Sequence, residues 1–131
     1  MITAEQMMTD CVVTIQADAT VSEAIDLLLA EGISGLPVID AEGRLVGILT
    51  EFALLAIAYD QAITGDRVKD HMTSEVLSVD VDTPVNKIAD MCIVHRVRRV
   101  PVLRDGKLVG LVARRDVLEA LYKAQAPVSM A

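Results

Sequence analysis

Residues 36–49 read LPVIDAEGRLVGIL, and residues 100–112 read VPVLRDGKLVGLV. Each stretch holds two β-rich runs joined by a polar turn with a glycine, which is the pattern of a β-hairpin. The similarity extends outward at an offset of 64 residues before the turn and 63 after it. The matched positions include Met8-Thr9 with Met72-Thr73, Asp26 with Asp90, and Tyr59 with Tyr122. The chain is therefore one unit written twice.

Each copy predicts the order strand, helix, strand, strand, helix. The first helix begins at a capping box formed by Thr20 and Glu23 and ends at Gly32. The last helix of this copy begins after a Thr50 cap and runs to about Ala58. We expect strands at 12–15, 36–39 and 45–49 in the first copy and at 100–103 and 108–112 in the second.

The second copy uses different helix signals. Thr83 is predicted to be the N-cap of a helix with Pro84 at its first position, where a missing N–H costs nothing. That helix is expected to end near Val94. We expect a first repeat at 1–60, a linker at 61–70 with a short turn at 68–71, a second repeat at 71–124 with its last helix at 114–123, and a flexible tail at 125–131.

Composition narrows the class of protein. Hydrophobic residues make up 53% of the 131, with a mean hydropathy of +0.45, which excludes a disordered chain. The uncharged apolar run at 52–59 is too short for a membrane span of about 20 residues. No signal peptide is apparent, and we expect a cytoplasmic protein whose two cysteines are free and buried. Aromatic residues are 2%, which argues against a nucleic-acid reader based on base stacking.

Charge is distributed unevenly along the chain. The net charge is −7, yet residues 1–60 carry ten acids and one base, a net −9, and residues 61–131 carry nine acids and eleven bases, a net +2. Most of those bases lie between Arg96 and Arg115. This concentration is typical of a local anion site rather than of general nucleic-acid binding.

The sequence has no pattern typical of catalysis. It contains no P-loop, no GxGxxG motif and no cysteine or histidine pair at metal-ligand spacing. His95 stands among arginines, with no acid beside it that could orient it as a base. We predict no enzyme activity, no catalytic residue, no metal and no required cofactor.

The motifs resemble a known family. Residues 32–50 (GISGLPVIDAEGRLVGILT) and 95–116 (HRVRRVPVLRDGKLVGLVARRD) are similar to the CBS domain, and the resemblance covers about residues 3–124. A tandem pair of these domains is called a Bateman module. The resemblance implies an α/β fold (α+β by some schemes) of two pseudo-symmetric β-α-β-β-α units packed sheet to sheet, with clefts at the junction. It also implies a stand-alone, energy-sensing regulatory module that binds AMP, ADP, ATP, NAD or S-adenosylmethionine.

Ligand-binding members open the last helix of a unit with T/S-x-x-D, whose hydroxyl and carboxylate hold the ribose and the α-phosphate region. The first copy has Thr50 but Ala53, and the second has Asp116 but Ala113. We favour the cleft at Asp116, where Arg99 and Arg115 would contact phosphate and the other unit would supply adenine contacts. The predicted residues of this cleft are Cys11, Val12, Val13, Ile33, Ser34, Gly35, Arg99, Ala113, Arg115 and Asp116. A second, weaker cleft would use Thr50, Val76, Leu77, Val97 and Arg98.

Other interpretations stay open for the same residues. Asp116 can also be an acid in a first helical turn, Thr50 a helix cap, and Arg96, Arg98 and Arg99 a solvated face that pairs with acids of the first unit. A ligand-free interaction module is the alternative function, because each cleft lacks half of the usual ribose clamp. The apolar helix at Phe52–Tyr59 predicts a homodimer, completed by the Val117–Lys123 helix, or a docking face for an effector protein.

Overall fold

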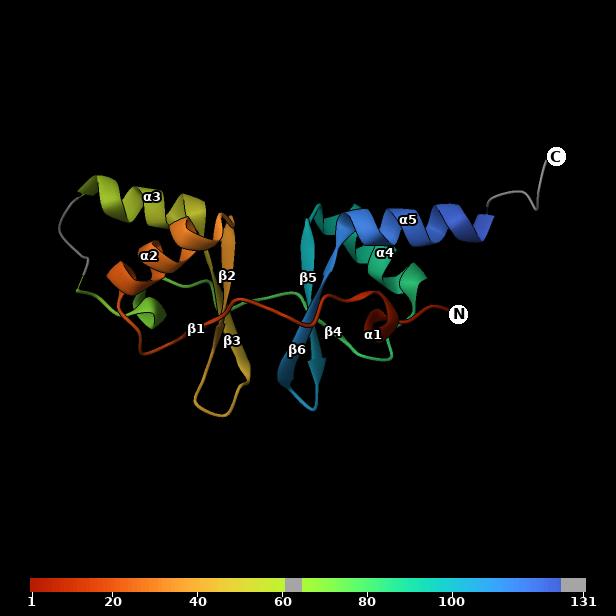
Figure 1. Ribbon diagram of the computed structural model, residues 1–131, viewed down its shortest axis with the longest axis horizontal. Helices are drawn as coiled ribbons and strands as arrows, with labels where there is room; N and C mark the ends of the chain where they lie inside the picture. Colours follow the sequence, from red (N-terminus) through yellow and green to blue (C-terminus); the bar gives the residue numbers. More distant parts are fainter. Residues whose placement is uncertain (61–64, 126–131) are drawn as a thin grey trace. The chain divides into compact units, whose positions relative to one another are not determined.

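The computed structural model describes residues 1–60 and 65–125. They form two compact units, each with a three-stranded sheet and helices on one face of that sheet (Figure 1). One unit, called here the β1–β3 unit, comprises Val13–Val76 and Gly106–Leu108. The other, the β4–β6 unit, comprises, of the described residues, 1–12, 77–105 and 109–125. The predicted α/β class is confirmed.

The β1–β3 unit is built on a hairpin. Strand β2 pairs antiparallel with β3 and parallel with the short β1, so β2 is central. Leu36 lies opposite Leu49, and both are fully buried with Val38 against the helices. The elements are β1 (Ile15–Gln16), α2 (Val21–Glu31), β2 (Gly35–Ile39), β3 (Leu45–Thr50), α3 (Glu51–Asp60) and the 3-10 turn η1 (Val68–Asp70).

The β4–β6 unit repeats this plan. Its strand order is β4-β5-β6, with β4 parallel to β5. Val100, Val102 and Val112 are fully buried and pack with Ile88 of the first long helix. The elements are α1 (Ala4–Met7), β4 (Val79–Asp80), α4 (Val85–His95), β5 (Arg99–Arg104), β6 (Lys107–Ala113) and α5 (Arg114–Gln125).

The compact units do not follow the boundaries of the sequence repeats. The opening segment of the chain folds with the second repeat, and residues 65–76 fold with the first. Thr9 exchanges backbone hydrogen bonds of 2.8 and 2.9 Å with Leu111 of β6, and Thr73 exchanges two of 2.9 Å with Ile48 of β3. Each repeated Met-Thr pair therefore adds one antiparallel bridge beside the last strand of its unit.

Two glycines allow this close approach. A Cβ atom added at Gly47 would lie 2.5 Å from Met72 Sδ and 2.9 Å from the carbonyl oxygen of Thr73. A Cβ atom at Gly110 would lie 2.8 Å from Met8 Cγ. Real Cβ atoms do not occur at such distances, so a strand residue without a side chain is needed where the methionine crosses the strand.

Most predicted element ends agree with the structure. Thr20 Oγ1 accepts from the Glu23 N–H at 3.1 Å, and Glu23 Oε2 accepts from the Thr20 N–H at 3.3 Å, which confirms the capping box. Gly32 ends α2 with φ of 64°. The strand expected at 12–15 is reduced to Ile15–Gln16, since only these residues pair with β2. Of the predicted tail at 125–131, only Gln125 lies inside the described residues, and it ends α5.

The prediction for the start of α4 was wrong. Pro84 is the N-cap, with extended backbone at ψ 154°, and the helix begins at Val85. The Thr83 hydroxyl accepts from the Asp80 N–H at 3.1 Å instead of capping the helix. The Val85 N–H donates to the Ile2 carbonyl at 2.9 Å, so the opening segment of the chain supplies an acceptor at this helix end. No helix among the described residues is long and apolar enough to cross a membrane.

Candidate functional site

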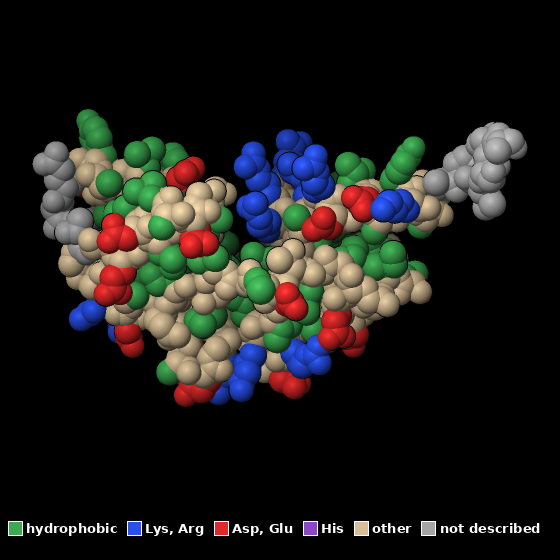
Figure 2. Space-filling view, viewed as in Figure 1, with side chains coloured by type: hydrophobic (Ala, Val, Ile, Leu, Met, Phe, Trp, Pro, Cys, Tyr) green, Lys and Arg blue, Asp and Glu red, His purple; other side chains and the backbone are tan. Residues whose placement is uncertain are grey.

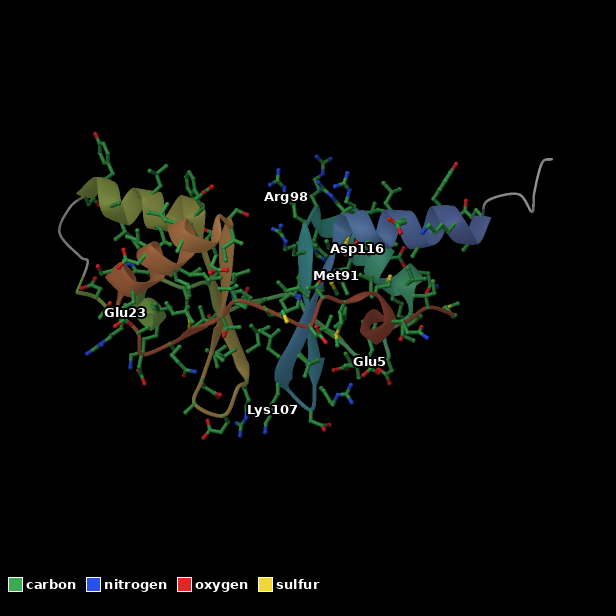
Figure 3. All side chains as sticks on the ribbon, viewed as in Figure 1. Glu5, Glu23, Met91, Arg98, Lys107 and Asp116 are labelled. Atoms are coloured by element: carbon green, nitrogen blue, oxygen red, sulfur yellow. The ribbon has the colours of Figure 1, made fainter. Side chains whose placement is uncertain are left out.

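The start of α5 collects the charged residues that the sequence singled out in the β4–β6 unit. Strand β6 runs directly into this helix, so Ala113 is its preceding residue and Arg114 its first. The Arg114 N–H donates to the Arg98 carbonyl at 2.7 Å, which holds the segment before β5 against the helix start. Asp116 lies in the first turn (Figure 3). This bond brings Arg98 and Arg99 to the same end of the unit as Arg115 and Asp116.

Five arginines form what we call the arginine cluster: Arg96, Arg98, Arg99, Arg114 and Arg115. All five are exposed, and Figure 2 shows basic side chains gathered over the start of α5. Within residues 1–60 and 65–125, none of the five forms an ion pair. Other bases of the same unit are paired, Arg104 with Glu5 and Lys123 with Glu119. The cluster is thus a concentration of uncompensated positive charge.

The first turn of α5 lacks a side-chain cap. Ala113 offers no acceptor to the helix, whereas at α3 the Thr50 hydroxyl accepts from the Ala53 N–H at 3.1 Å. Asp116 is half-buried, and its carboxylate has no hydrogen-bond partner in the part of the chain described. A helix N-terminus with bare amides favours an anion, and guanidinium groups provide paired N–H donors for phosphate oxygens.

The β1–β3 unit has the equivalent backbone arrangement with different side chains. The Glu51 N–H donates to the Ser34 carbonyl at 2.9 Å, as Arg114 does to Arg98. Gly35 lies opposite Thr50 in the sheet, so the small residues before β2 adjoin the start of α3. The interpretation of Thr50 as a helix cap is confirmed, because its hydroxyl is bonded to Ala53.

The predicted site residues therefore divide between the units. The favoured set places Val13, Ile33, Ser34 and Gly35 in the β1–β3 unit and Cys11, Val12, Arg99, Ala113, Arg115 and Asp116 in the β4–β6 unit. The weaker set places Thr50 and Val76 in the former and Leu77, Val97 and Arg98 in the latter. Their assembly into two clefts stays a prediction.

The two cysteines differ, although both were expected to be buried. Cys92 packs in the core of the β4–β6 unit, while Cys11 is exposed. Burial raises the pKa of the Cys92 thiol, and the positive charge of Arg114 acts in the opposite direction. Cys92 therefore stays a protonated thiol at neutral pH. In the described residues no three His, Cys, Asp or Glu side chains gather as a metal site.

Arg99 and Arg115 were predicted to contact phosphate, while Arg114, at the same predicted helix start, and Arg96 were not among the predicted cleft residues. The bond from the Arg114 N–H to the Arg98 carbonyl places Arg114 beside the segment that carries Arg98 and, two residues earlier, Arg96. The alignment of the repeats contained this signal, because it pairs Arg98 with Ser34 and Arg114 with Glu51. A bond found between the two residues in one repeat is therefore expected between their counterparts in the other.

A sequence profile of the CBS domain matches residues 4–60 and again residues 68–123. The chain belongs to the CBS domain family. The two matches confirm a tandem pair of CBS domains and cover most of the chain. Each match begins close to one of the Met-Thr segments that bridge the last strands.

Proteins similar in sequence to this chain include an enzyme and a CBS domain-containing protein of similar length. The chain is 36% identical over 124 residues to inosine-5'-monophosphate dehydrogenase of Methanocaldococcus jannaschii, a match that covers 94% of this chain but 24% of that enzyme. It is 32% identical to a CBS domain-containing protein of Dictyostelium discoideum, covering 95% and 94% of the two chains. The chain thus spans a small part of the enzyme, and the match concerns the enzyme's CBS part alone.

Solved structures agree with the fold. The crystal structure of CBSX2 in complex with AMP has a TM-score of 0.81 and 30% identity, covering 94% of this chain and 98% of that chain. CBSX2 from Arabidopsis thaliana has a TM-score of 0.83 and 28% identity, covering 96% and 98%. The mixed sheets and flanking helices are therefore those of CBS pairs.

Proposed function

We propose that this CBS pair is a regulatory module that binds an adenosine-containing nucleotide and signals by a change of conformation, without catalysing a reaction. The observation that carries this proposal is the arginine cluster with Asp116 at the uncapped start of α5. The likeness to CBSX2, a structure in complex with AMP, supports an adenine nucleotide as the ligand. The nucleotide is a regulatory ligand rather than a cofactor.

Each proposed contact has a chemical reason. The Asp116 carboxylate accepts hydrogen bonds from the ribose hydroxyls, and Arg99 and Arg115 bind the phosphate nearest the ribose. Apolar side chains and backbone groups of Cys11, Val12, Val13, Ile33, Ser34 and Gly35 form the adenine-contacting set. Signalling follows only if the nucleotide binds one conformation more tightly than another, because equal affinities shift no equilibrium.

The decisive experiment is calorimetry with AMP, ATP, NAD and S-adenosylmethionine on the unaltered protein and on two variants. We expect Asp116→Ala and Arg99→Ala each to weaken nucleotide binding about tenfold or more, the loss of a charge-assisted hydrogen bond. Lys87→Gln is the matched control, because it removes a base of the same unit outside the cluster. Binding that survives both variants would refute the placement, and no binding by any of the four would refute the function.

The cysteines provide an independent reading of the same site. A thiol reagent should modify exposed Cys11 first, since Cys92 is buried with a raised pKa. Bound nucleotide is expected to slow the modification of Cys11 in the unaltered protein but not in Asp116→Ala. An unchanged rate at saturating nucleotide would remove Cys11 from the adenine-contacting set.

A second candidate function, protein interaction, is favoured by exposed apolar stripes on two helices. On α3, Phe52, Leu55 and Tyr59 are 80%, 64% and 84% exposed, and on α5, Leu118 and Tyr122 are 68% and 72% exposed. Leu55 and Tyr59 match Leu118 and Tyr122 in the repeat, so each copy carries the same stripe. We propose a homodimer through Phe52–Tyr59 and Val117–Lys123, because a self-complementary contact uses equivalent surfaces.

Light scattering tests the dimer. We expect a dimer at about 100 µM and a monomer for Leu55→Glu, since a charge placed in an apolar contact weakens it strongly. Leu29→Glu is the control, because Leu29 is 71% exposed on α2, outside both stripes. A monomer at this concentration in the unaltered protein would exclude the dimer.

A further inference from the structure

We propose that the arginine cluster makes this module selective for a nucleotide with a chain of phosphates, a nucleoside triphosphate before a diphosphate, over a nucleoside monophosphate. This inference rests on the proposed function and adds to it the class of nucleotide. Its basis is the number of arginines that the fold collects around one helix start.

The cluster draws on three separate elements. Arg96 ends α4 in the left-handed conformation with φ of 53°, Arg98 and Arg99 precede and open β5, and Arg114 and Arg115 begin α5. The bond from the Arg114 N–H to the Arg98 carbonyl fixes two of these elements together. Guanidinium groups are always charged, so five of them in one patch repel each other unless an anion compensates them.

The acids near the cluster do not compensate it. Glu119 lies one turn beyond Arg115 but is bonded to Lys123 at 2.9 Å. That hydrogen bond and the charge of Lys123 lower the pKa of Glu119, and Arg115 contributes in the same direction. Asp116 is the one remaining carboxylate of the first turn. Five guanidinium groups and one carboxylate leave a local charge of +4.

This charge exceeds what a monophosphate can neutralise. A phosphate monoester carries about −1.5 to −2 at neutral pH, and each further phosphate of the chain adds about −1, so a triphosphate approaches about −4. One phosphate accommodates the two contacts already proposed for Arg99 and Arg115. The other three arginines then face the second and third phosphates of a longer chain, where they bind oxygens in pairs.

The same charge argues against an adenosine ligand without phosphate. S-adenosylmethionine carries a sulfonium and an ammonium group against one carboxylate, so its net charge has the same sign as the cluster. A cluster of this kind weakens the binding of such a cation and strengthens the binding of a polyanion. This preference decreases as salt screens the charges.

Calorimetry with ATP, ADP, AMP and inorganic tripolyphosphate tests the inference at two salt concentrations. We expect ATP to bind at least tenfold more tightly than AMP at low salt, with ADP between them, and the ratio to shrink at high salt. The double variant Arg96→Gln with Arg114→Gln is expected to lower the affinity for ATP at least tenfold and the affinity for AMP less than threefold. Lys87→Gln should leave the ratio of the two affinities unchanged.

The outcomes separate this inference from the function on which it rests. Equal affinities for AMP and ATP, or a ratio that survives the double variant, would overturn the selectivity and leave the adenine nucleotide proposal standing. Binding of tripolyphosphate alone, lost in the double variant, would support the cluster as a polyphosphate site while refuting the nucleotide. If no ligand binds, both proposals fail.

Discussion

The two units share a backbone plan but differ at the start of their last helices. In both, the first N–H of the helix donates to a carbonyl two residues before Leu36 or Val100, from Glu51 to Ser34 and from Arg114 to Arg98. At α3 a threonine caps the helix and one acid, Glu51, follows, while at α5 the cap is missing and arginines lie around the helix start. Duplication thus preserved the hydrogen-bonded frame and changed the charge placed on it. The α3 end is closed by its own side chain, and the α5 end is the one we propose for anion binding.

The largest expected effect tests the part that the copies share. Gly47→Ala should lower the free energy of unfolding by about 3 kcal/mol, because the new methyl group meets the Thr73 carbonyl as well as Met72. Gly110→Ala should cost less, about 1–2 kcal/mol, because its three nearest atoms all belong to the flexible Met8 side chain. Urea unfolding measures both.

Gly35→Ala is the control for these variants. Its Cβ atom would lie 3.9 Å from the Leu49 carbonyl, an ordinary contact, so we expect a change below about 0.5 kcal/mol. Equal losses for Gly47→Ala and Gly110→Ala would contradict the difference in what the two glycines face.

A cap exchange addresses the helix starts directly. Thr50→Ala should destabilise the protein by about 1 kcal/mol, because the Ala53 N–H loses its acceptor. Ala113→Thr should stabilise it by up to about 1 kcal/mol, because the new hydroxyl can accept from the Asp116 N–H in the same way. Thermal unfolding without ligand compares the two. Destabilisation by Ala113→Thr would mean that the α5 end cannot adopt the geometry of the α3 end.

The smallest effect concerns the charges. Arg114→Gln should stabilise the ligand-free protein by a few tenths of a kcal/mol at low salt, because it removes one of five like charges. This gain should disappear at about 1 M salt, where the screening length falls to about 3 Å. Arg104→Gln is the comparison, since it breaks an ion pair with Glu5 and should bring no gain. A loss of stability on Arg114→Gln at low salt would show that the cluster is compensated.

Local signals predicted most of the fold. The hairpins at 36–49 and 100–112 and the Thr20–Glu23 box were readable because each depends on neighbours in the chain. The start of α4 was not, because its first N–H bonds to Ile2, more than eighty residues away. For the same reason the similarity between repeats did not reveal that each opening segment folds with the other repeat.

The candidate site was predictable to a similar degree. The sequence placed Asp116, Arg99 and Arg115 at one helix start, and the structure brings them to the same end of the β4–β6 unit. Arg96 and Arg114 were not among the predicted cleft residues, and the bond from the Arg114 N–H to the Arg98 carbonyl, just before β5, is what brings the two arginine-bearing segments together. The exposure of Cys11 was missed because a hydrophobic pattern does not show which apolar residues lack a partner strand.

The exchanged Met-Thr segments have a consequence for fragments that contain one repeat. A polypeptide cut after the first repeat would keep Gly47 without Met72, and its own Met8 would have no strand to join. Each half would then lack the Met-Thr segment that bridges its last strand, and only a mixture of the two fragments would contain both segments with both strands. A single repeat would therefore complete this sheet edge only with a Met-Thr segment from a second chain, whereas a chain with two repeats carries both segments itself.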